Sequence, residues 1–120
     1  MLKVHVDPST QTVLLEPEGP LSPQEFEYLA QRVDPLIKES GDLNGVLVHA
    51  RQFPGWDSWA AFMAHLRFIK QHHRQVKKVA LSTNSPWGRW AAQLASHWLA
   101  PQIKIFPYEE LAQAQRWIES

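Results

Sequence analysis

Residues 45–82 read GVLVHARQFPGWDSWAAFMAHLRFIKQHHRQVKKVALS, and this stretch decides the fold. It begins with Gly45–Ala50, an apolar run without polar alternation, which is typical of a strand covered on both faces. It ends with a second apolar strand, Val76–Ser82. Between the two, Asp57 or Ser58 can cap a helix. The stretch therefore predicts two parallel strands joined by a right-handed helical crossover.

The residues before this stretch predict a hairpin and a helix. Leu2–Val6 and Thr12–Glu16 are strand-like and flank a turn at Asp7-Pro8-Ser9. Ser22 and Glu25 have the spacing of a capping box, which marks the start of a helix. Pro23 suits the first helical position, Leu21 can pack on Phe26, and Gly41 suits the residue just past the end. The expected buried stripe is Phe26, Leu29, Val33, Leu36 and Ile37.

The residues after it predict one more helix, strand and helix. Ser85-Pro86 opens a helix, Ile103–Phe106 forms a strand, and Tyr108–Ile118 forms the closing helix. The complete order is ββαβαβαβα, which indicates an α/β domain with a mostly parallel sheet and an N-terminal hairpin. At 120 residues the chain is expected to be a single domain, residues 1–120.

The composition excludes several classes of function for this chain. Twelve basic and twelve acidic residues give a formal charge of zero, so no global field favours nucleic acid. The chain has no cysteine, and its histidines lack the i, i+4 spacing of a helical metal site. We therefore expect no metal, no cofactor and no nucleic-acid partner. Without a long apolar stretch, the chain is expected to be cytoplasmic, with peripheral membrane contact as an additional hypothesis.

Six tryptophans are the most distinctive residues. Helical spacing assigns four of them, Trp59, Trp87, Trp98 and Trp117, to the core. Trp56 lies in a loop after Phe53-Pro54-Gly55, and Trp90 lies at the edge of its helical stripe. Both follow predicted strands, so we expect them at the carboxyl edge of the sheet, where ligands of α/β proteins bind. The predicted site for a small apolar or amphipathic ligand consists of His49, Phe53, Trp56, Trp87 and Trp90.

His49 has three interpretations. It can be a hydrogen-bonded core histidine or line the ligand site, and catalysis together with Asp57 and Ser58 is a further alternative. Spacing alone does not establish a triad, so we expect a non-enzymatic binding domain.

The predicted helix after Ser58 has two notable surfaces. Its expected inward stripe is Trp59, Phe62, Met63, Leu66, Ile69 and His73. Phe68 points the opposite way, with the small residues Ala61 and Ala64 beside it. Either another element covers this side, or it is a partner surface for a protein or a second copy of the chain. The basic run after Lys70 complements the helix carboxyl end, and it is expected far from the tryptophan rim.

The chain resembles the SpoIIAA-like family within the wider STAS-type fold. The landmarks are Gly19-Pro20-Leu21, Gly45-Val46-Leu47-Val48, Leu66-Arg67-Phe68, Lys78-Val79-Ala80-Leu81, Trp87, Ile105-Phe106, Ala114 and Trp117-Ile118. The resemblance implies a bacterial α/β domain of order ββαβαβαβα. It also implies either of two functions, one for each branch of the family.

Anti-sigma-factor antagonists of this fold carry a phosphorylated serine in an Asp-Ser-small-Gly motif. Asp57-Ser58 stands at that place, but Trp59-Ala60 follows instead of the small residue and glycine. Regulation of a protein interaction at Ser58 is therefore the alternative function. The branch that this chain resembles most is associated with apolar ligands or membrane contact. The acidic pair of that branch is replaced here by Ala64-His65.

Overall fold

The computed structural model describes residues 1–95 and 97–120, apart from the side chains of Trp87, Gly88, Arg89, Ala92 and Leu94. The strands are β1 (Leu2–Asp7), β2 (Thr12–Pro17), β3 (Leu43–His49), β4 (Val76–Ser82) and β5 (Gln102–Phe106). The α-helices are α1 (Pro23–Ser40), α2 (Trp59–His72), α3 (Pro86–Ala95) and α4 (Leu111–Glu119), with short 3-10 turns η1 (His73–Gln75) and η2 (Tyr108–Glu110). The predicted element order is confirmed.

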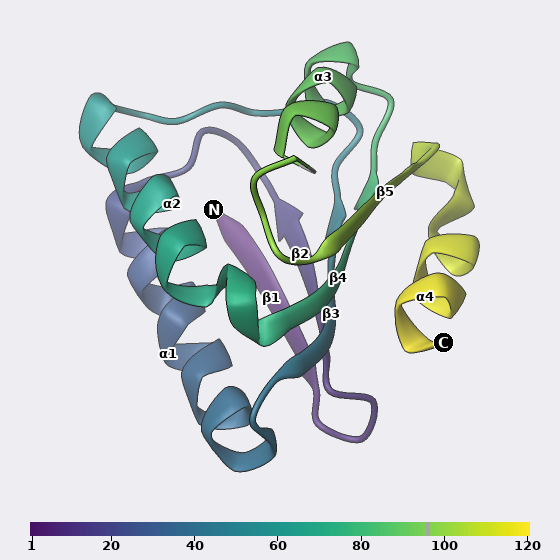
Figure 1. Cartoon of the computed structure of the whole chain (residues 1–120). Helices are drawn as coiled ribbons and strands as arrows, with labels where there is room; N and C mark the ends of the chain where they lie inside the picture. The colour runs from purple at the N-terminus through teal and green to yellow at the C-terminus, as the bar shows by residue number, and fades with distance from the viewer. Residues whose placement is uncertain (96) are drawn as a thin grey trace.

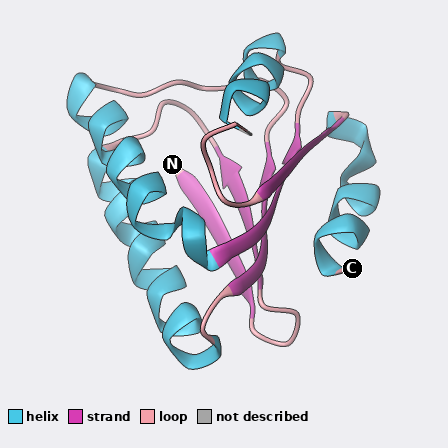
Figure 2. Ribbon diagram, in the orientation of Figure 1, coloured by secondary structure: helices cyan, strands magenta, loops and turns pink. Residues whose placement is uncertain are grey.

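The strands form one mixed sheet in the order β1-β2-β3-β4-β5. β1 pairs antiparallel with β2, and the remaining neighbours are parallel. The helices α1 and α2 lie side by side on one face of the sheet, and α4 lies on the other face (Figure 1). Figure 2 shows α3 beyond the edge of the sheet where the parallel strands end. The hairpin and the parallel sheet are as predicted.

The start of α1 matches the predicted cap. The Ser22 N–H donates to Glu25 Oε2 (2.7 Å), so the glutamate satisfies a backbone donor that the helix leaves open. At the other end, Gly41 has a φ of 88°, and its N–H donates to the Ile37 carbonyl. A left-handed residue at this position favours glycine. The expected stripe of α1 is buried in the core.

Two apolar cores cover the two faces of the sheet. The larger core packs β1–β3 against α1 and α2, and the smaller packs α4 against the sheet. In the smaller core, Leu47 is fully buried beneath Ala114 and Ile118. Gly45 lies so close to α4 that an added Cβ would be 2.7 Å from Ile118 Cβ.

The predicted orientation of α2 is wrong. The buried residues of this helix are Ala61, Ala64 and His72, and Phe68 packs partly buried against the larger core. Ala61 and Ala64 are small enough to let α2 approach α1 closely, and His72 bonds to Asp34 of α1 (2.7 Å). The proposed partner surface of Ala61, Ala64 and Phe68 is therefore covered within the domain.

Two of the four tryptophans assigned to the core lie elsewhere. Trp59 is 74% exposed and Trp98 is 79% exposed. Trp117 packs partly buried against the core beneath α4, in agreement with its prediction. The prediction for the side chain of Trp87 lies outside the described residues. The exposure of Trp59 follows from the orientation of α2, because this helix is apolar on both sides and its more compact side faces inward. Trp98 lies after the end of α3.

Candidate functional site

The loop between β3 and α2 is fastened to the segment before α1. The Leu21 N–H donates to the Gly55 carbonyl (2.9 Å), and the Asp57 N–H donates to the Leu21 carbonyl (2.8 Å). These bonds form an isolated parallel bridge between Leu21 and Trp56. Gly55 permits this path because its φ is 81°, a conformation that glycine adopts without strain. The loop is a packed segment of the fold.

Trp56 is half-buried at the centre of an aromatic cluster. Its indole N–H donates to His65 Nδ1 (3.2 Å). The ring meets Phe53 and Phe62 edge to face, at centroid distances of 4.9 and 4.7 Å. Such pairs contribute about 1 kcal/mol each beyond their burial. Three contacts therefore hold the indole in one orientation.

His65 connects this cluster to the core. Its ring stacks on Phe26 at a centroid distance of 4.9 Å. Burial lowers the pKa of His65 to about 4, because the charged form loses its hydration. The ring is therefore neutral at pH 7, with Nδ1 free of a proton and able to accept from Trp56.

The cluster reaches the surface through Trp59. The rings of Trp59 and Phe62 lie 5.2 Å apart, so aromatic contacts run without a break from Phe26 to an exposed indole. The outward side of α2 continues with Met63 and Leu66, which are 36% and 44% exposed. We call Trp59, Met63 and Leu66 the outer face of α2. On α3, Trp90 is 55% exposed.

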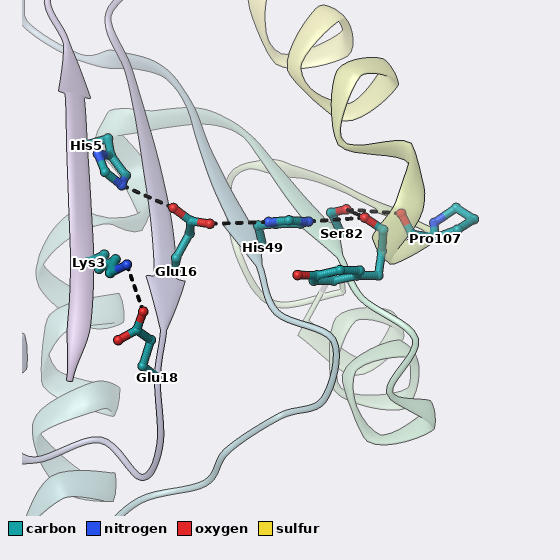
Figure 3. A network of polar contacts seen from close by, with 8 residues as sticks. Lys3, His5, Glu16, Glu18, His49, Ser82 and Pro107 are labelled. Atoms are coloured by element: carbon teal, nitrogen blue, oxygen red, sulfur yellow. Dashed lines mark hydrogen bonds and ion pairs between the residues drawn. The ribbon is translucent and has the colours of Figure 1, made fainter.

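The structure does not bring His49 to this cluster. His49 lies on the side of the sheet that carries α4, and its ring stacks on Tyr108 at a centroid distance of 4.2 Å. Its Nε2–H donates to the Tyr108 carbonyl (3.1 Å), and Glu16 Oε2 lies 3.5 Å from Nδ1 without making a hydrogen bond (Figure 3). Glu16 also bonds to His5 (3.1 Å). His49 therefore belongs to a polar network that ties β2 and β3 to the turn before α4.

Asp57 and Ser58 do not form the suggested triad with His49. Ser58 is exposed and is the N-cap of α2, where its Oγ accepts from the Ala61 N–H (3.1 Å). The imidazole of His49 is engaged with Tyr108 instead. Of the two predicted caps, Ser58 is the one that the structure uses.

Replacing Ser58 by alanine is expected to destabilise the fold by about 1 kcal/mol, because an N–H at the start of α2 loses its acceptor. Urea denaturation followed by tryptophan fluorescence measures this loss. Ser58→Asp is the matched control, since aspartate also caps and should remain close to the parent. Equal losses in the two variants would contradict a capping role.

Two hollows lie away from the aromatic cluster. One is a cavity of about 30 Å³ between the sheet and α1, bordered by Phe68 and His72, which is the size of one water molecule. The other is an open groove of about 440 Å³ along β1, bordered by Lys3, His5, Glu25 and Tyr28. The first is too small for a ligand, and neither includes a predicted binding residue.

In residues 1–95 and 97–120, no three His, Cys, Asp or Glu side chains gather closely enough to hold a metal ion. None of the helices in the same ranges is both long and apolar enough to cross a bilayer.

Sequence reasoning missed the parts of the site that join Trp56 to the surface, namely Phe62, His65 and the outer face of α2. The available signal was that α2 carries two apolar stripes. One contains Trp59, Phe62 and Leu66, and the other contains Ala61 and Phe68. A helix that can bury only one side must expose the other.

Comparison with known proteins agrees with this architecture. The family model described as SpoIIAA-like matches residues 12–119. A solved structure of an uncharacterized protein with a SpoIIAA-like fold from Shewanella loihica PV-4 is 18% identical and has a TM-score of 0.72. The match covers 98% of this chain and 92% of that one. No curated protein matches the chain. With the family model matching nearly the whole chain, the protein belongs to the SpoIIAA-like family.

Proposed function

We propose that this domain is a non-catalytic module that binds an amphipathic, lipid-like ligand on the outer face of α2. The SpoIIAA-like fold supports a regulatory or binding module in general. The observation that carries the finer proposal is that α2 is apolar on both sides. Its inner side is buried against the core, whereas Trp59, Met63 and Leu66 on its outer side remain exposed to water. Contiguous exposed apolar groups of this kind mark binding surfaces.

The aromatic cluster supplies a rigid base for this surface. Trp56 is held by its bond to His65 and by the rings of Phe53 and Phe62. An apolar chain lying on Trp59 would therefore meet a surface that does not have to be ordered on binding, which reduces the entropic cost. Phe53, Trp56 and Trp90 remain proposed ligand contacts, with Trp90 contributing from α3. Trp87 remains a proposed contact on the basis of the sequence. His49 is no longer included, because its ring stacks on Tyr108 at the other face of the sheet.

Titration with lysophosphatidylcholine below its micellar concentration, followed by calorimetry, tests this function. The double variant Trp59→Ala/Leu66→Ala is expected to bind at least about tenfold more weakly, because two apolar side chains no longer cover the acyl chain. Tyr28→Ala is the matched control, since Tyr28 is an exposed aromatic residue on α1. Unchanged binding in the double variant would overturn the proposal, as would an equal loss in the control.

The exposed position of Ser58 favours a second candidate, a protein-interaction module switched by phosphorylation. A phosphate at this position would lie at the amino end of α2, where the helix dipole stabilises negative charge. It would also stand beside the exposed indole of Trp59. Intact-mass measurement of protein isolated from cells tests this candidate. A phosphorylated species that is lost in Ser58→Ala would support it, and an unmodified mass under all growth conditions would remove its basis.

A further inference from the structure

The sheet has a free edge along β1. This strand comes first in the sheet order, so β2 occupies only one of its two edges (Figure 1). Its residues, Leu2–Asp7, include no proline, and their register with β2 is continuous without a bulge. Proline and bulges are common devices that keep an edge strand from pairing further. β1 is therefore a regular template on which another strand can pair.

The hydrogen bonds at the start of β1 determine which backbone groups face this free edge. The Glu18 N–H donates to the Met1 carbonyl (2.6 Å), and the Met1 amine donates to the Glu18 carbonyl (3.0 Å). Hydrogen-bonded and non-hydrogen-bonded pairs alternate along an antiparallel ladder, so every second residue after Met1 uses its backbone groups for β2. The residues whose N–H and carbonyl point outward are Leu2, Val4 and Val6.

One side chain of α1 reaches these outward groups. Arg32 donates to the Val4 carbonyl over 3.5 Å, which is longer than an ordinary hydrogen bond, and donates to the Tyr28 hydroxyl over 2.8 Å. The contact agrees with the outward direction of the Val4 carbonyl. Because it is long, a backbone N–H at normal distance can replace it. Tyr28, which is 43% exposed, also borders the open groove along β1.

The side chains of β1 alternate between the two faces of the sheet. Those of Lys3, His5 and Asp7 are exposed on the face opposite α1, where Figure 3 shows Lys3 and His5. Hydrogen bonds from Ser9 lower the pKa of Asp7, so its carboxylate is charged at pH 7. Lys3 and Asp7 are placed symmetrically about His5 and have opposite charges. An antiparallel copy of the same strand can therefore match each charge with its opposite.

We propose that β1 pairs antiparallel with β1 of a second copy of this chain, so that the two sheets join across a two-fold axis. Val4 of one copy lies opposite Val6 of the other, and each such pair exchanges both of its free backbone hydrogen bonds. Lys3 lies opposite Asp7, and His5 lies at the axis. Moving the register by one pair would bring Lys3 opposite His5 and lose the ion pairs. The same patch is used twice, so the assembly closes as a dimer.

The charge pattern favours a second copy over an unrelated extended peptide, which could use the same backbone groups. Lys3 Nζ already lies 2.9 Å from Glu18 Oε1, but its ammonium has three donors and can also contact Asp7 of the second copy. On the other face the two α1 helices would lie side by side, with each Tyr28 beside the groove of the other copy. This surface is separate from the outer face of α2, so the inference does not depend on the proposed function.

Sedimentation velocity at increasing protein concentration tests this dimer on the full chain. The parent is expected to change from monomer to dimer below about 1 mM. Val6→Pro removes an outward N–H that β2 does not use, so the fold should survive, as circular dichroism checks. Its dimer should be at least about tenfold weaker, because both copies lose a backbone hydrogen bond. A parent that stays monomeric would overturn the proposal, as would a folded Val6→Pro protein that dimerises like the parent.

Mixing two charge variants tests the register, and it remains decisive if Val6→Pro does not fold. Lys3→Glu leaves only acidic groups at the two matched positions, and Asp7→Lys leaves only basic ones. Each variant alone should dimerise about tenfold more weakly than the parent, because like charges face each other across the axis. An equimolar mixture should recover the dimer, since opposite charges then face each other at both positions.

Lys70→Glu is the matched control, because it makes the same charge change at an exposed position on α2. This variant should dimerise as the parent does. An equal loss in Lys70→Glu would mean that net charge alone controls association and would overturn the proposal. A mixture of Lys3→Glu and Asp7→Lys proteins that stays as weak as its components would overturn the register of Lys3 opposite Asp7.

Discussion

Acidification from pH 7 to pH 4 is expected to remove about 3 kcal/mol of stability through His65 alone. The folded state lowers the pKa of His65 to about 4 by burial, whereas an unfolded histidine titrates near its ordinary value of 6.5. Between these two values the unfolded chain binds a proton that the folded chain does not. The unfolding free energy therefore rises with pH across this window, and the contribution is complete above about pH 6.5.

Protonation of the buried ring would also break the bond from Trp56. Protonated His65 has hydrogens on both ring nitrogens, so Nδ1 can no longer accept from the indole. The cation would also lie stacked on Phe26 in a buried position. Acid should therefore release Trp56 and the loop that carries it before the rest of the fold unfolds, with a change in tryptophan fluorescence.

Urea denaturation at pH 7 and at pH 4 measures the effect, since carboxylates also titrate and the comparison must be made between variants. In His65→Gln, whose amide oxygen can still accept from Trp56, the acid-induced loss should be smaller by about 3 kcal/mol. His97→Gln changes an exposed histidine and should lose as much as the parent. An acid-induced loss in His65→Gln equal to that of the parent would refute the assignment.

The parts of the fold that were predictable have local causes. The capping box of Ser22 and Glu25, the turn at Gly41 and the apolar stripe of α1 each act within a few residues, so their meaning is visible in the sequence. The strand order also follows, because alternating strands and helices with right-handed crossovers leave few arrangements. These signals do not depend on which neighbour an element packs against.

The orientation of α2 depends on such a neighbour, and it was not predictable. Both sides of the helix are apolar, and the larger residues Trp59, Met63 and Leu66 have the stronger hydrophobic signal. The side that faces inward is the one that packs better against α1. Ala61 and Ala64 allow α2 to approach α1 closely, and His72 forms a hydrogen bond with Asp34 of α1. Neither the room available nor the position of Asp34 can be obtained from helical spacing.

The position of His49 has a similar explanation. A strand that is covered on both faces has no polar alternation, so the sequence does not indicate which face a given residue occupies. In β3, Leu47 faces α4, and His49 follows at the same parity. His49 therefore lies on the opposite side of the sheet from the predicted site and stacks on Tyr108. Phe53 and Trp56, by contrast, are in contact with each other as predicted neighbours of one loop.

Replacing Gly45 by alanine is expected to destabilise the domain by about 3 kcal/mol, through overpacking against α4. The added Cβ would lie 2.7 Å from Ile118 Cβ and 3.2 Å from its Cγ2. The nearest atom is attached directly to the backbone of α4, so rotation of the Ile118 side chain cannot move it away. The whole helix must shift, which disturbs the contacts of Leu47 and Ala114 in the same core. Thermal unfolding should occur roughly 10 °C lower.

The origin of this clash can be isolated by a double-mutant cycle. Ile118→Ala keeps the Cβ, so Gly45→Ala should remain costly in that background. Ile118→Gly removes the Cβ, and there Gly45→Ala should cost less than about 1 kcal/mol, although Ile118→Gly is itself destabilising. If Gly45→Ala cost the same in both backgrounds, the close approach of β3 and α4 would not be its cause. A lower cost in the Ile118→Gly background would show that α4 can pack this closely on the sheet only when residue 45 has no Cβ. This helix covers the face of the sheet opposite α1 and α2.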